Sequence, residues 1–289
     1  MRKNLGPDST VPIDRICDVC VWRNVSTRAR LLRYLYLPVG LLLVLFRLSA
    51  IVLMSLATSA LPSAVKPALY RALLWVLNIR VKCPMSLRQV AAHTDGCVVA
   101  SNHISVFDHY PVLAMPHATL IVVRSDSLLG KLTGHLLFQC SGARYWKVAD
   151  KRQLARRLRQ WRQSPLGTTL YTTPEATINN GLGLFRFRPE FLVRGLPVVP
   201  LAMRLKAPFM LNPNPLYGAG PMKFLRLLSM PWLEFELNFL ERQVFAPGQS
   251  DQAFADQVQA CIAQQLQIPA TQWTREDKYR FRNERSSRG

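Results

Sequence analysis

The chain has 289 residues, of which 49% are hydrophobic, so it can bury a substantial core and wholesale disorder is excluded. Lys and Arg number 37 against 17 Asp and Glu, and the formal net charge of +20 favours anionic partners. Charge alone leaves nucleic acid, acidic lipid surfaces and phosphorylated small molecules open, and the apolar segments have to decide among them.

The first segment, residues 1–30, is polar and interrupted by glycine and proline, so we expect it to be irregular. Cys17 and Cys20 have CxxC spacing, which is weak evidence for zinc without a second pair or a nearby His. The six cysteines are scattered along the chain. We therefore expect reduced thiols, a reducing compartment and no metal site.

Residues 31–62 contain an apolar run that is long enough for a membrane helix, which needs roughly 20 residues. Pro38 and Gly40 favour a kink, and Arg47 is costly near the centre of a bilayer. A re-entrant hairpin, with Arg47 near a turn or snorkelling to headgroups, fits at least as well as a spanning helix. A buried core helix is the third interpretation. Arginines just before the run predict that its start faces the cytoplasm: Arg28, Arg30 and Arg33.

Residues 63–272 alternate short β-like runs with helical patterns, which predicts an α/β domain with a layered sheet and helices on both faces. The tail over 273–289 is strongly charged, and we expect it to be frayed. The predicted strands are 97–100, 119–123, 168–171, 197–202 and 232–240, and apolar residues at helical spacing mark helices around 154–161 and 254–266.

The strand at 97–100 leads into a polar turn that contains His103 and Asp108, the position where α/β sheets place reactive groups. Five positions apart on a helix, the two side chains would point about 140° away from each other. They can meet only if His103 lies in the turn. Asp108 would then fix one imidazole nitrogen, leaving the other to remove a proton from an alcohol. The alternative is a helix-capping box formed by Ser105 and Asp108. We expect His109 to point away from His103.

A second carboxylate follows the strand at 168–171, in the sequence Glu175-Ala176-Thr177-Ile178-Asn179. It occupies the same kind of turn as the His–Asp pair. Two such turns in one sheet favour catalysis over capping alone.

Three motifs in order now resemble those of lysophospholipid and glycerophosphate acyltransferases, over about residues 95 to 205. They are His-x4-Asp within 102–108, Pro-Glu-x-Thr at 174–177 and Leu-Pro-Val-Val-Pro at 196–200. Pro38-Val39-Gly40, Ala60-Leu61-Pro62 and the motif flanks also resemble the ancient ubiquitous protein subgroup. That subgroup joins a membrane hairpin to an acyltransferase-like domain, and we expect this chain to lack the ubiquitin-binding modules of its longer members.

The resemblance implies acyl transfer from acyl-CoA to a lysophospholipid or glycerolipid hydroxyl, with His103 as base and Asp108 orienting it. Acyl-CoA is the co-substrate, and no cofactor or metal is expected. Backbone N–H groups that follow Ser105 are the expected oxyanion donors. The expected substrate-binding residues are Asn102, Glu175, Thr177, Asn179, Arg144 and Arg124.

Two departures from the family pattern bear on activity. Ala176 stands where the family usually has Gly, so we expect the loop to avoid positive φ there. Ile178 stands where an Arg often follows, which favours a lysophospholipid with a headgroup over bare glycerol phosphate. The alternative function is a non-catalytic acyltransferase-like scaffold on the endoplasmic reticulum or lipid droplet surface.

A basic amphipathic helix around 147–162 suits anionic headgroups, the phosphates of CoA, or plain solvent. The predicted partners are membrane lipids and acyl-CoA, with no nucleic acid, and any protein partners are unknown. The predicted location is membrane-attached with the globular domain facing the cytoplasm, at the endoplasmic reticulum or lipid droplets if the source is eukaryotic.

Overall fold

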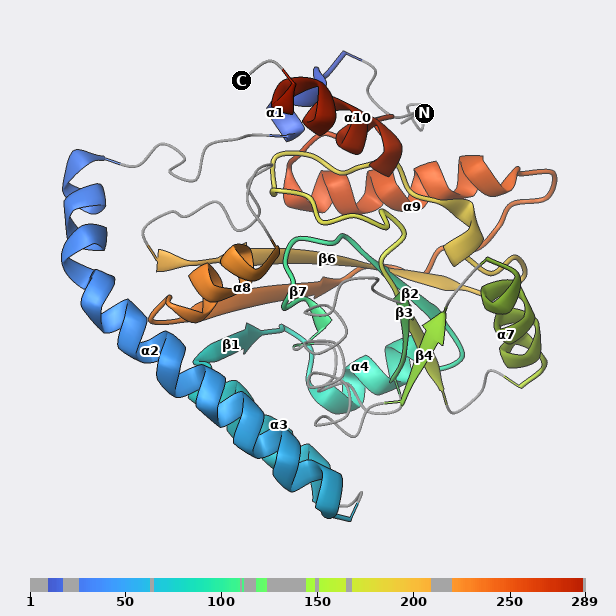
Figure 1. The fold of residues 1–289 in the computed structure, drawn as a ribbon. Coiled ribbons are helices and arrows are strands. Elements are labelled where there is room, and N and C mark those ends of the chain that lie inside the picture. The colour runs from blue at the N-terminus through green and yellow to red at the C-terminus, as the bar shows by residue number, and fades with distance from the viewer. Residues whose placement is uncertain are drawn as a thin grey trace.

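A seven-stranded sheet forms the centre of the molecule (Figure 1). The structure, a computed structural model, describes residues 10–17, 26–62, 65–109, 111, 118–123, 144–148, 151–164, 168–208 and 220–287. The strand order is β1-β7-β6-β2-β5-β3-β4. Neighbouring strands are parallel except for β6 and β7, which are antiparallel. The bounds are β1 Ile79–Lys82, β2 Val98–Ser101, β3 Ala118–Val123, β4 Arg144–Val148, β5 Thr169–Thr172, β6 Val198–Lys206 and β7 Leu233–Phe239.

The central strands confirm the predicted runs, because β2 and β5 are buried at every residue. Strands covered on both faces read as continuous apolar runs, which is how the sequence shows them. The two edge strands, β1 and β4, were not predicted. β1 carries alternating charges and buries only its first residue, so it has no core pattern of its own.

Helices cover both faces of the sheet, as predicted. One core layer joins the sheet to α3 (Lys66–Val76), α4 (Leu87–Thr94) and α8 (Gly220–Leu228) through Leu73, Val90 and Leu227. The opposite layer joins it to α7 (Lys151–Gln163) and α9 (Asp251–Leu266) through Leu158, Trp161 and Val258. The predicted α/β class is therefore confirmed.

The apolar N-terminal run forms one continuous helix, α2 (Thr27–Ala60), which contains Pro38. The chain turns only after this helix, and α3 packs back against it (Figure 1). Arg47 is therefore mid-helix and not at a turn, and the prediction that it snorkels to headgroups is also wrong. Its guanidinium donates to carbonyl oxygens at and just after the end of α8: Leu228 at 2.7 Å, Met230 at 2.5 Å and Pro231 at 3.2 Å, and to that of Val76 at 3.3 Å.

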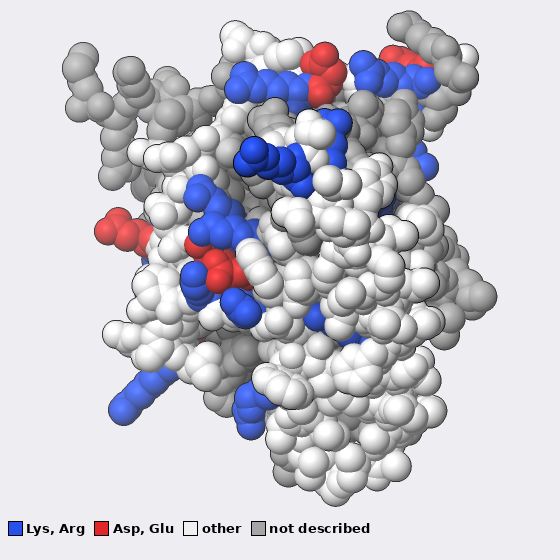
Figure 2. All heavy atoms as spheres, turned by 90° about the vertical axis from the view of Figure 1, so that its left-hand side faces the viewer, with Lys and Arg blue, Asp and Glu red and all other residues white. Residues whose placement is uncertain are grey.

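α2 has an inverted pattern, in which two arginines, Arg33 and Arg47, face the protein. Arg33, Gly40, Val44, Arg47 and Ile51 form its buried stripe, whereas its outward face is apolar. Figure 2 shows this outward face as a broad white surface, with Lys and Arg gathered above and beside it. Residues 27–54 contain an 18-residue window with a mean hydropathy of 2.4 and are long enough to cross a membrane, by length and composition. The exposed residues include Leu31, Leu35, Leu42, Leu45, Phe46, Leu53 and Leu56.

Residues 11–17 and the tail over 275–286 both belong to the folded domain. The tail expected to be frayed forms α10 (Arg275–Ser286), which begins at a capping box made by Thr274 and Asp277. Before α2, residues 11–17 include the short helix α1 (Ile13–Ile16) and pack against Phe185. The indole N–H of Trp273 donates to the carbonyl of Val11 at 2.8 Å and ties the two ends together.

Candidate active site

The candidate site lies where two neighbouring parallel strands, β2 and β5, end at the same edge of the sheet. His103 follows β2 and Glu175 follows β5. Asn102 fixes the turn after β2 because its side chain exchanges two hydrogen bonds with the main chain of Met203, at 2.8 and 2.9 Å. Asn102 is fully buried, so its amide is used within the protein.

His103 and Asp108 meet as the turn geometry requires. His103 lies in an irregular turn, and its Nδ1 is 2.7 Å from Oδ2 of Asp108. The same carboxylate oxygen accepts the N–H of Ile104 at 2.6 Å, while Ser105 Oγ accepts the N–H of Phe107 at 3.1 Å. The predicted capping box is not formed as such, because the hydroxyl of Ser105 accepts the N–H of Phe107 and not that of Asp108. Asp108 nevertheless both satisfies the backbone and holds the imidazole.

Burial decides the electrostatics of this pair. The side chain of Asp108 is fully buried, whereas that of His103 is 17% exposed. Burial raises the pKa of Asp108 above its usual range, and the hydrogen bond with His103 opposes that rise. Because the carboxylate of Asp108 accepts a hydrogen bond, Nδ1 of His103 carries the proton and donates that bond, and Nε2 is left as the basic nitrogen.

Two of the expected oxyanion donors, the N–H groups of Phe107 and Asp108, are not free. The N–H groups of Ile104 and Phe107 donate to side chains of the turn, and that of Asp108 donates to the carbonyl of Ser105 at 3.4 Å. These three amides are engaged in building the turn.

Glu175 is fully buried and acts as the hub of the adjoining loop. Its Oε1 accepts the N–H of His103 at 2.7 Å and the side-chain amide of Asn179 at 2.8 Å, and Oε2 accepts the N–H of Phe185 at 2.8 Å. Burial raises the pKa of Glu175 to about 8, although the three donors favour the charged form. The contacts of Glu175 position His103, and its carboxylate has no open side for a substrate.

Ala176 overturns one expectation, because its φ is +51° and the loop keeps the left-handed conformation that glycine favours. A left-handed non-glycine residue costs roughly 1–2 kcal/mol. The sequence departure therefore leaves strain in the loop and does not change its path.

The strain at Ala176 predicts an unusual response to glycine. Because the loss of strain offsets the roughly 0.4–1 kcal/mol that glycine costs through the unfolded chain, Ala176→Gly should leave stability unchanged or raise it by up to about 1 kcal/mol. Ala155, which is exposed on α7, provides the control, since Ala155→Gly should cost about 1 kcal/mol. Thermal unfolding in detergent compares them, and equal destabilisation by both would contradict the strain.

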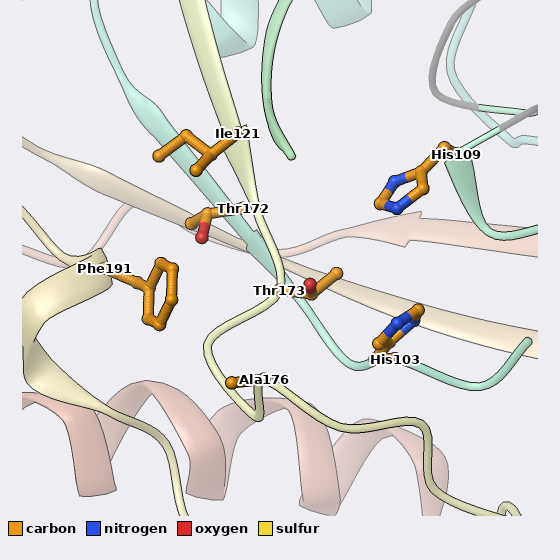
Figure 3. A pocket seen from close by; sticks show the side chains of 7 residues that line it. All are labelled: His103, His109, Ile121, Thr172, Thr173, Ala176 and Phe191. Atoms are coloured by element: carbon orange, nitrogen blue, oxygen red, sulfur yellow. The ribbon is translucent and has the colours of Figure 1, made fainter. Parts of the chain in front are cut away.

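A pocket of about 160 Å³ opens beside His103 (Figure 3). It is lined by His103, His109, Ile121, Thr172, Thr173, Ala176 and Phe191. The expectation that His109 points away is wrong, because the two histidine rings lie 5.8 Å apart, centroid to centroid. The threonines lie at the carboxyl end of β5 and just after it, a position that could have identified them from sequence.

Burial, with a smaller contribution from His103, lowers the pKa of His109 to about 3. Its folded-state pKa lies below its unfolded value, so as pH falls from about 6.5 towards 3 the unfolded chain takes the proton first and stability is lost. His109→Gln should flatten this loss, on the order of 1–2 kcal/mol relative to wild type by pH 5. Unfolding midpoints at pH 7 and 5 measure it, and parallel falls in both proteins would refute the assignment.

The remaining predicted substrate residues are placed as follows. Thr177 and Asn179 are buried in the loop after Glu175, and the N–H of Asn179 donates to the carbonyl of His103 at 2.6 Å. Arg144 begins β4, three strands away from β2. Arg124 lies outside the described residues. Substrate binding by these residues stays a prediction.

Sequence reasoning missed Lys278 of α10. Its ammonium group donates to Thr177 Oγ1 at 3.2 Å and to the carbonyl of Ile178. No sequence motif connects it to a loop 100 residues earlier, and only the packing of α10 brings it there.

A mixed α/β sheet with a buried His–Asp pair at the carboxyl end of its strands has the fold of glycerophosphate acyltransferases. The crystal structure of the 1-acyl-sn-glycerophosphate acyltransferase PlsC from Thermotoga maritima matches with a TM-score of 0.51, covering 79% of this chain and 96% of that one at 13% identity. No family model matches the chain.

Curated relatives agree with this fold. The lipid droplet-regulating VLDL assembly factor AUP1 of Danio rerio is 27% identical over 255 residues, which is 86% of this chain and 57% of the relative. The lysophospholipid acyltransferase LPCAT4 of Homo sapiens is 29% identical over 209 residues, 69% of this chain and 38% of the relative. The chain thus spans about half or less of these relatives' length. These likenesses confirm the resemblance to the lysophospholipid and glycerophosphate acyltransferase family.

Proposed function

We propose that this protein transfers an acyl group from acyl-CoA to the hydroxyl of a lysophospholipid or glycerolipid. The observation that carries the proposal is the 2.7 Å contact between His103 and Asp108 beside an open pocket. An imidazole held by a buried carboxylate is a general base for an alcohol. The relatives named as acyltransferases support the same reaction class.

The proposed reaction is direct transfer. Nε2 of His103 removes the hydroxyl proton of the acceptor, whose oxygen attacks the thioester carbonyl and forms the new ester carbon–oxygen bond. Collapse of the tetrahedral intermediate breaks the carbon–sulfur bond, and the imidazolium of His103 returns its proton to the thiolate of CoA. Asp108 holds Nδ1 throughout. The hydroxyl of Thr173, which lines the same pocket, is the proposed oxyanion donor.

The basic helix α7 is better placed to bind the phosphates of CoA than to contact the membrane in which α2 lies. α7 contacts the edge strand β4, whereas α3, which packs on α2, contacts the opposite edge strand β1. Seven strands spaced by about 4.8 Å separate these edges by roughly 29 Å. The exposed arginines of this helix are Arg152, Arg156, Arg159 and Arg162.

The apolar outward face of α2 indicates membrane association. We propose that α2 lies with this face in the lipid and keeps its arginine-bearing stripe on the domain, because Arg33 and Arg47 are both bonded to residues where α8 ends. The basic N-terminal end of α2 favours a domain that faces the cytoplasm. The name of the AUP1 relative favours a lipid droplet surface.

A transfer assay tests this function directly. The full chain, purified in non-ionic detergent, is given labelled acyl-CoA and a panel of monoacyl lipids with different headgroups. We expect a diacyl product with at least one phosphate-bearing acceptor. If no product formed with any acceptor, the proposal would be contradicted.

The second candidate is a membrane scaffold that keeps this fold without turnover. It is favoured by the AUP1 relatives, one of which matches 86% of the chain and is named as an assembly factor. The strained Ala176 at the rim of the pocket is the structural feature that agrees with it. Intact folding with no transfer to any acceptor would favour the scaffold.

A further inference from the structure

Four cations from two helices gather near the loop that follows Glu175. Lys223 and Arg226 lie three positions apart on α8, and Lys278 and Arg282 lie four apart on α10, so each pair shares one helix face. Arg282 is exposed and the other three are half-buried. Lys278 reaches the loop itself through its bonds to Thr177 and Ile178.

Both helices adjoin the His–Asp turn. On α8, the ring of Phe224, next to Lys223, lies 5.2 Å from that of Phe107, centroid to centroid. On α10, Lys278 holds the loop whose Asn179 donates to the carbonyl of His103. Two separate helices that carry these cations therefore adjoin the catalytic turn.

Among the described residues, Glu175 faces the cluster through Lys278, and its carboxylate already accepts three hydrogen bonds. The sequence has no Asp or Glu from residue 201 to 232, and on α10 Glu276 pairs with Arg188 while Asp277 caps the helix. Nη1 of Arg226 is buried and has no hydrogen-bond acceptor among the described residues. Burial and the neighbouring Lys278, Arg282 and Arg226 lower the pKa of Lys223 to about 8. Bringing like charges together out of water is costly, and a bound anion would relieve that cost.

The cluster also lies beside the helix that faces lipid. Ser229, which follows α8, accepts a hydrogen bond from Arg33 of α2 at 2.8 Å. An acyl chain lying along the apolar face of α2 would bring its polar end to α8. Figure 2 shows cationic side chains above and beside that apolar surface.

We propose that Lys223, Arg226 and Arg282 bind the phosphate group of the acceptor lipid, with Lys278 holding the neighbouring loop in place. This inference rests on the proposed function, because it assigns the acceptor to the class of phosphate-bearing monoacyl lipids. Ammonium and guanidinium groups donate strong, charge-assisted hydrogen bonds to phosphate oxygens. The loop that Lys278 holds also contacts His103, which lines the neighbouring pocket.

Binding of two lipids that differ only in the phosphate tests the inference. Dissociation constants for lysophosphatidic acid and for monoacylglycerol with the same acyl chain are measured on the full chain in non-ionic detergent. The wild type should prefer lysophosphatidic acid, and the double variant Lys223→Gln/Arg226→Gln should weaken that binding by about tenfold without changing monoacylglycerol binding. Arg71→Gln/Arg88→Gln removes two exposed charges elsewhere, on α3 and α4, and should change neither.

A charge-preserving variant and a competition measurement distinguish phosphate recognition from a folding defect and from a free-anion site. Lys223→Arg/Arg226→Lys keeps both charges and should restore most of the preference, which a mere folding defect would not allow. Inorganic phosphate competing as well as glycerol 3-phosphate would indicate a free-anion site and overturn the lipid assignment, as would equal loss of both lipids. Phosphate-selective binding in a protein that transfers no acyl group would sink the proposed function and leave this subsite standing.

Discussion

Replacing Asp108 by Asn is expected to lower the rate of acyl transfer by about a thousandfold or more. One oxygen of Asp108, Oδ2, contacts both Nδ1 of His103 and the N–H of Ile104, so an Asn oxygen in its place keeps the turn but carries no charge. Without the buried negative charge, the imidazolium that forms when Nε2 takes the hydroxyl proton is no longer stabilised.

The measurement is the initial rate with saturating acyl-CoA and acceptor, compared with the unfolding midpoint of the same sample. A rate close to wild type in the folded variant would show that the negative charge of Asp108 does not matter for transfer. Ser105→Ala is the matched control in the same turn, because the Ser105 hydroxyl accepts a backbone N–H there, and it should cost far less.

Replacing Arg47 by Met is expected to destabilise the fold by about 3 kcal/mol or more. Arg47 is 3% exposed, and its guanidinium donates to four carbonyl oxygens, three of them where α8 ends. Met fills the space and leaves those carbonyls without donors, and it separates α2 from the domain. Lys would keep the charge but could not span the four acceptors.

Thermal unfolding in detergent measures this effect as a fall of roughly 6–12 °C. Arg30→Met, at an exposed position on the same helix, is the control and should stay within about 0.5 kcal/mol. If both variants unfolded at the wild-type temperature, the proposal that Arg47 holds α2 to the end of α8 would be disproved.

The sequence predicted those parts of the fold whose residues carry their own pattern. The buried strands β2 and β5 are continuous apolar runs, and α9 repeats apolar residues at helical spacing. The path of α10 could not be predicted, because its stability comes from a capping box and from contacts with Phe185 and the N-terminal segment. Arg47 was misplaced because a bilayer was assumed around it, whereas its acceptors at the end of α8 are 181 or more residues away in the chain.

The His–Asp contact could be predicted because both residues lie in one turn after one strand. The role of Glu175 could not, because its three donors come from separate segments at residues 103, 179 and 185. Likewise, Ala176 was expected to exclude positive φ, yet the hydrogen bonds on either side hold the loop in that conformation. The hydrogen bonds around the loop therefore outweigh the preference of alanine for negative φ.

The most direct measurement is the transfer rate of His103→Gln beside wild type, with the same acyl-CoA, acceptor and detergent. Removal of the base should lower the rate by about a hundredfold to ten-thousandfold while the unfolding temperature stays within a few degrees. A wild-type rate in that variant would contradict the assignment of His103 as the group that takes the hydroxyl proton.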